Sequence, residues 1–184
     1  VVAGSSKKNG DVSYMDTGIY TDNVAVVASD GHKGFAVIGA GVDQTAIDGG
    51  GTDRCIVLDS IQGVAIRDLT LRHGKAGPWT GRANHGGALL ATSSGLLIEN
   101  AALRDSTASV DGGGGWIDRG EVTLNDVIVS GNAATNLGGG LRLEWLDGVG
   151  SYILLTNCLI HGNSAAHAGG LGIMDHAVAR NCVI

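Results

Sequence analysis

Two neighbouring segments of the chain carry residues of mixed chemistry at equivalent places. Trp116 and Asp118 stand 26 residues before Arg142 and Glu144. An aromatic ring can stack on a sugar, an arginine can pair with a uronate, and carboxylates can act as general acid and base. These four residues are therefore candidates for contact with an acidic sugar polymer. The alternative interpretation is a salt-bridge ladder on the surface, with Trp116 partly buried.

A long loop concentrates further basic and aromatic residues. It runs from residue 73 to residue 85 and contains Lys75, Trp79, Arg82 and His85. Loops of this length in a compact domain are often functional. We expect these side chains to lie beside the first set, where they could contact an acidic glycan. The alternative is that the loop is a solvated cover, with Trp79 packed onto the domain.

Other classes of site find little support in the residues. His161, His167 and His176 lack the spacing of a zinc site. We predict no cofactor, with Ca²⁺ left open but not indicated, because no repeated Gly-Gly-x-Gly-x-Asp array occurs. The formal net charge is −6 and the 12 basic residues are scattered, which predicts that nucleic acid is not a partner. No apolar run approaches the ~18 residues of a membrane span, so none is expected.

The elements that must position these residues are repeats bounded by Gly-Gly. The chain has 32 glycines, and Gly-Gly recurs at 86–87, 114–115, 139–140 and 169–170, between short apolar runs. Aligned on these pairs, the repeats share a column of Asn or Asp at steps of 24 to 32 residues: Asp68, Asn100, Asp126, Asn157 and Asn181. A second column follows six residues later: Gly74, Ser106, Asn132 and Asn163. A repeat of this length is typical of a solenoid.

The apolar runs have the pattern of strands. They are three to six residues long, rich in Val, Ile and Leu, and alternate with period two, while no window shows a helical period. One repeat cannot bury its apolar face alone, but stacked copies can. Asn and Asp tolerate the left-handed backbone of a tight bend, and stacked Asn side chains can bond one another. We therefore predict an all-β parallel β-helix without a long helix, with the first column on one edge and Leu143 and Leu155 in the core.

Strand phase decides which side chains face outward. In the strand after the third Gly-Gly, the two leucines should point inward, which leaves Arg142 and Glu144 outside. In the preceding repeat, one phase places Trp116 outside and the other places Ile117 outside. The four glycines before Trp116 leave both phases open.

One repeat has a recognisable pattern. Residues 155–170 read Leu-Thr-Asn-Cys-Leu-Ile-His-Gly-Asn-Ser-Ala-Ala-His-Ala-Gly-Gly, and residues 122–140 and 96–115 are looser copies. This pattern resembles the repeat of pectate-lyase-like right-handed parallel β-helix proteins, and residues 10–24 and 36–49 are similar to the opening rungs of such domains. The resemblance implies a right-handed parallel β-helix (solenoid) with three strands per rung. It would form a single domain, with opening rungs at 1–54 and regular rungs at 55–184.

The resemblance indicates the fold more than the function. The family includes polysaccharide lyases, hydrolases, epimerases, phage tailspikes and surface adhesins. In its enzymes the substrate groove usually runs over the outer face of the first strand, walled by variable loops, which is where both candidate sets would lie. Because no catalytic signature is present, we expect an extracellular or cell-surface module with a structural or adhesive role that contacts polysaccharide. The alternative is a polysaccharide lyase or hydrolase acting on an acidic glycan.

The last rungs carry two further expectations. Cys158 and Cys182 follow the column Asn in adjacent rungs, where either a disulfide or a stack of two buried thiols would fit. The final repeat stops at Ile184, partway through a rung. This predicts further rungs beyond residue 184 or another chain against that edge, because an open rung leaves strand groups unpaired.

Overall fold

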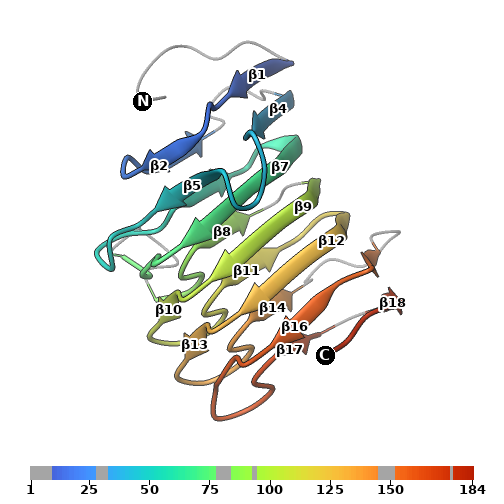
Figure 1. Cartoon of the computed structure of the whole chain (residues 1–184). Helices are drawn as coiled ribbons and strands as arrows, with labels where there is room; N and C mark the ends of the chain where they lie inside the picture. The colour runs from blue at the N-terminus through green and yellow to red at the C-terminus, as the bar shows by residue number, and fades with distance from the viewer. Residues whose placement is uncertain (1–9, 28–32, 78–83, 93–94, 145–151, 175) are drawn as a thin grey trace.

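The computed structural model describes residues 10–27, 33–77, 84–92, 95–144, 152–174 and 176–184. All regular elements within these ranges are β-strands, and they stack as the rungs of a parallel β-helix (Figure 1). The predicted right-handed parallel β-helix is confirmed. Among the described residues, no helix is long and apolar enough to cross a membrane.

Sheet B contains the first strand of each rung. Its strands are parallel and lie in the order β17–β14–β11–β8–β6–β3. Their bounds are β3 (Val24–Val27), β6 (Ile56–Asp59), β8 (Leu89–Thr92), β11 (Gly115–Asp118), β14 (Leu141–Glu144) and β17 (Leu171–Ile173). Four of these six strands begin at or just after the Gly-Gly pairs on which the repeats were aligned.

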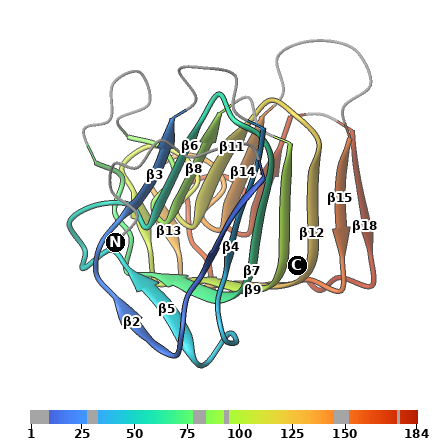
Figure 2. The ribbon, with the colours of Figure 1, turned by 90° about the horizontal axis from the view of Figure 1, so that it is seen from above.

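Sheet A bends around the other two sides of the solenoid (Figure 2). In β7 (Gln62–Arg72), β9 (Leu96–Arg104) and β12 (Val122–Ser130), the second and third strands of a rung run on as one bent strand. Elsewhere the second strands are β1 (Asp11–Tyr14), β4 (Lys33–Ile38), β15 (Ile153–Thr156) and β18 (Ala177–Arg180). The third strands are β2 (Gly18–Tyr20), β5 (Thr45–Asp48) and β16 (Leu159–His161). A small sheet of β10 (Thr107–Ala108) and β13 (Ala133–Ala134) lies before the next rung.

The first column forms the bend inside sheet A, as predicted. All its residues have a positive φ of 45° to 57°: Asp68, Asn100, Asp126, Asn157 and Asn181. Asn and Asp are enriched in this left-handed conformation. The side chains also bond along the column, since Asn100 donates to Asp68 at 2.6 Å and Asn181 donates to Asn157 at 2.7 Å.

The second column forms a ladder inside the solenoid. The backbone N–H of Ser106 donates to Oδ1 of Asn132 at 3.0 Å, and that of Asn132 donates to Oδ1 of Asn163 at 3.0 Å. Above them, the N–H of Gly74 donates to the Ser106 hydroxyl at 2.9 Å. Ser106 and Asn132 are 0% and 1% exposed, so these bonds satisfy polar groups that water cannot reach.

The inner ladder explains why Gly-Gly recurs. A Cβ at Gly114 would lie 2.6 Å from the carbonyl oxygen of Gly140 and 2.9 Å from Nδ2 of Asn132. Successive rungs therefore approach too closely at this corner for any side chain. The Gly-Gly pairs are a packing requirement of the stacked corner.

Aliphatic side chains from both sheets fill the core. Leu143 is 1% exposed and Leu155 is fully buried, as predicted. Cys55 and Cys158 are also buried. Cys158 and Cys182 are free thiols at equivalent places in successive rungs.

Candidate functional site

The outer face of sheet B brings together the four residues first singled out. Strand register places Trp116 beside Arg142, and Asp118 beside Glu144. Ile117 packs in the core, so the phase with Trp116 outside is the one that the structure adopts. We call these four residues the sheet B face.

Three residues of the sheet B face are buried although they point away from the core. Trp116 is 1% exposed, Asp118 is 3% exposed and Arg142 is 6% exposed. The Trp116 ring belongs to a small apolar cluster with Val57 and Leu90, separate from the main core. In this structure the ring contacts protein and offers no open plane to a sugar.

The charged members of the face are paired with one another or with neighbours. Nε of Arg142 donates to Oε1 of Glu144 at 2.9 Å, and Nε of Arg119 lies 3.8 Å from Oδ2 of Asp118. The Arg142 side chain extends over Gly172 of the next rung, where a Cβ would lie 3.3 Å from Cδ and Nη1 of the arginine. The missing side chain of Gly172 thus makes room for this arginine.

The loop residues divide between two places. His85 joins the sheet B face, because its ring centroid lies 5.4 Å from that of Trp116. Nδ1 of His85 lies 3.3 Å from Oδ2 of Asp111. Lys75 is exposed, and its backbone pairs with Thr107 of the next rung. Trp79 and Arg82 lie outside the described residues.

A buried arginine binds both described ends of the loop. Arg54 is 1% exposed and donates to the carbonyl oxygens of Gly77, His85 and Gly86 at 2.8 to 3.2 Å. Burial lowers the pKa of its guanidinium, and the charge of Asp53 opposes that shift. This role could not be predicted from the repeat pattern, because Arg54 belongs to no repeat column.

Asp111 is a second organising residue that the repeat pattern missed. Its Oδ1 accepts from Nδ2 of Asn136 and from the backbone N–H of Leu137, both at 2.9 Å, while its Oδ2 faces His85. It ties the rung of Trp116 to the next one. Among the described residues, no group of three or more His, Cys, Asp or Glu side chains is placed to hold a metal ion.

Comparisons with known proteins agree with the fold. No family model and no curated protein matches the chain. A solved structure of a mutant pectin methylesterase in complex with a hexasaccharide matches 85% of the chain with a TM-score of 0.50 and 13% identity. A second pectin methylesterase complex gives a TM-score of 0.40 and 11% identity. The first likeness shows a shared β-helix fold.

The matching region is only part of those proteins. The chain covers 58% of the length of either pectin methylesterase. Their activity and ligands are therefore properties of longer proteins with little sequence in common with this one.

Proposed function

We propose that this chain is a secreted or cell-surface β-helix module with a structural or adhesive role, which contacts an acidic polysaccharide without cleaving it. The observation that carries this proposal is that the side chains of the sheet B face are buried or paired with one another. A general acid or base must come within hydrogen-bond reach of the proton that it transfers. Asp118 is buried and Glu144 is bonded to Arg142, so the two carboxylates are engaged in holding the surface together.

Carbohydrate as the partner is supported by the fold and by the basic loop. The pectin methylesterase that shares the fold is complexed with a hexasaccharide. In this chain, Lys75 is exposed and Arg82 stands in the same loop. Because the chain has a net charge of −6, a polyanion would be repelled by the molecule as a whole. Contact with an acidic glycan therefore depends on such local basic groups, and it should weaken with added salt.

The proposal is tested by electrophoresis of the protein through gels that contain polygalacturonate, alginate or a neutral galactan. We expect retardation in the acidic gels alone. Unsaturated products, new reducing ends and released methanol should stay at background in parallel assays of the same protein. Formation of any of these products, or migration unaffected by every acidic polysaccharide, would overturn the proposal.

Matched single-charge variants locate the contact. Lys75→Gln and Arg82→Gln should each reduce the retardation. Arg180→Gln removes the same charge from the exposed end of β18 and should leave it unchanged. Equal loss in all three variants would show a nonspecific charge effect and contradict a contact at the loop.

A further inference from the structure

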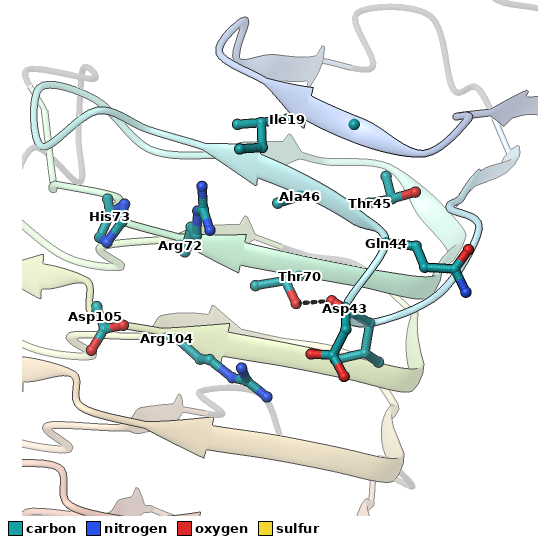
Figure 3. A pocket seen from close by; sticks show the side chains of 12 residues that line it. Ile19, Asp43, Gln44, Thr45, Ala46, Thr70, Arg72, His73, Arg104 and Asp105 are labelled. Carbon is teal, nitrogen blue, oxygen red and sulfur yellow. Dashed lines mark hydrogen bonds between the residues drawn. The ribbon is translucent and has the colours of Figure 1, made fainter.

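A cleft of about 290 Å³ opens on the outer face of sheet A, on a different side of the solenoid from the sheet B face. Its floor is formed by the third-strand parts of β5, β7 and β9, and a loop at residues 39–44 hangs over it (Figure 3). None of the candidate residues from the sequence lines this cleft. It lies where an insertion interrupts the regular bend of the rungs.

Hydrogen bonds hold the overhanging loop in place. The backbone N–H of Gly41 donates to the carbonyl oxygen of Asp68 at 2.9 Å, at the first residue of the outer column. The Thr70 hydroxyl donates to the carbonyl oxygen of Val42 at 2.5 Å. At the far end of the loop, the Thr45 hydroxyl donates to the carbonyl oxygen of Asp16 at 3.0 Å. The loop is thus bonded to the rungs on both sides, and the cleft is preformed.

The cleft is lined by two arginines, Arg72 and Arg104, and only Arg72 is paired with a carboxylate of its own strand column. Strand register aligns Asp48, Arg72 and Arg104 in one outward column. Asp48 accepts from Nε of Arg72 at 2.8 Å and contacts Nδ1 of His73 at 3.1 Å. Its carboxylate is therefore occupied, and Arg104 stands one rung further away.

Arg104 lacks an acceptor for one of its buried donors. Its Nε is shielded from solvent and has no hydrogen-bond partner among the described residues. The neighbouring Asp105 does not fill this need, because its carboxylate lies against Gly131 of the next rung. An unsatisfied guanidinium donor of this kind is costly, and the Arg104 side chain as a whole lines the cleft.

We infer that this cleft binds a carboxylate-bearing monosaccharide unit, a uronic acid residue, with its carboxylate on the Arg104 guanidinium. A guanidinium matches a carboxylate in a planar, charge-assisted pair. Gln44 lies at the rim and can bond sugar hydroxyls, while Ile19 and Ala46 form an apolar wall for the ring (Figure 3). The site is separate from the contact proposed at the loop of residues 73–85.

The size of the cleft limits the ligand. Its volume lies just below the roughly 300–1,000 Å³ range of small-molecule sites. It admits a single sugar unit, such as a chain end or a branch, rather than a polymer laid across several rungs. Asp43 carries a carboxylate on the overhanging loop, so it should repel the ligand and favour a single negative charge.

The test is a titration of the protein with galacturonate, galactose and galactose 6-sulfate. Binding is monitored through the NMR signal of the Arg104 Nε–Hε group. That signal is assigned by its loss in Arg104→Gln. We expect saturable shifts with galacturonate and none with galactose. Arg104→Gln should lower the affinity for galacturonate by roughly tenfold or more, Arg104→Lys should restore part of it, and Asp43→Asn should raise it.

Control variants distinguish binding at this cleft from a general charge effect, and the outcomes are independent of the test of the proposed function. Arg180→Gln should change the affinity less than about twofold, and the thermal midpoint of each variant checks folding. Binding that survives Arg104→Gln, equal binding of galactose, or tighter binding of the sulfate would overturn the inference. These outcomes leave the polysaccharide proposal standing, because its test reads retardation by polymers and depends on Lys75 and Arg82.

Discussion

Trp116 and Arg104 both point away from the core, yet their surroundings give them different roles. Trp116 is 1% exposed against Val57 and Leu90, whereas Arg104 lines an open cleft. Strand alternation predicts the outward direction of such side chains, but it says nothing of what covers them. Covering depends on the irregular loops, which differ from rung to rung.

The burial of Trp116 gives the first prediction. Trp116→Ala should lower the free energy of unfolding by about 3–5 kcal/mol, because it removes a large buried ring and leaves a cavity. Urea denaturation measures this change, with Lys75→Gln as the exposed control, expected within about 0.5 kcal/mol. A loss for Trp116→Ala as small as that of the control would mean that the ring is open to solvent and free to meet a sugar.

The thiols give a second prediction at the same scale. Burial raises the pKa of the Cys55 thiol to about 12 and also raises that of Cys158. The thiolate is the reactive form, so Cys55 should resist a thiol reagent at pH 8 until the protein is unfolded, whereas the partly exposed Cys182 should react in the native state. Mass spectrometry of the labelled peptides checks this. Native labelling of Cys55 at the rate of a free thiol would contradict its burial.

The raised pKa of Cys55 also predicts how the stability of the fold changes with pH. An unfolded Cys55 loses its proton near pH 9.0, while the folded one keeps it to about pH 12. The contribution of this thiol to stability is therefore fully present below pH 9.0 and is lost as the pH rises toward 12.

At the scale of elements, two columns of polar residues organise the rungs in different ways. The outer column sets the bend through left-handed residues such as Asn100 and Asp126. The inner column joins successive rungs through buried bonds at Asn132 and Asn163. The sequence showed both columns at fixed spacing, but only the geometry separates an outer bend from an inner ladder.

The inner ladder leads to a prediction about cooperativity between rungs. Asn132→Ala should destabilise the protein by about 1–3 kcal/mol for each buried group left without a partner, which includes the N–H of Ser106 and the carbonyl oxygen of Leu103. Asn125→Ala is the matched control, because Asn125 is half-buried on the outer side of β12. Thermal unfolding compares the two variants. Equal, small losses would mean that the ladder adds little to the stacking of rungs.

At the scale of the whole molecule, the repeat made the fold predictable and the irregularities made the sites unpredictable. A 24- to 32-residue pattern with Gly-Gly and Asn columns leaves few alternatives to a β-helix. Arg54 and the loop at 39–44 belong to no column, and Arg104 lies outside the two columns of Asn, Asp and Ser, so the pattern does not mark them. Their roles come from contacts between segments that are 23 to 32 residues apart, as between Arg54 and Gly86.

The two contacts that we propose for acidic sugars lie on different sides of the solenoid. His85, at the end of the basic loop, lies beside Trp116 on sheet B, and the Arg104 cleft lies on sheet A. A rigid solenoid holds these surfaces at a fixed separation. This arrangement suits a module that holds a polymer and a chain end or branch, whereas catalysis requires reacting groups to converge at one place.

Calorimetric titration of the protein with oligogalacturonate tests the central claim most directly, because one experiment reports both binding and turnover. The account predicts a saturable heat of binding, with the baseline returning after every injection and intact oligosaccharide recovered at the end. A sustained heat flow with shortened or demethylated product would contradict it by showing catalysis. The absence of any saturable heat at low salt would contradict it by removing the acidic glycan as a partner.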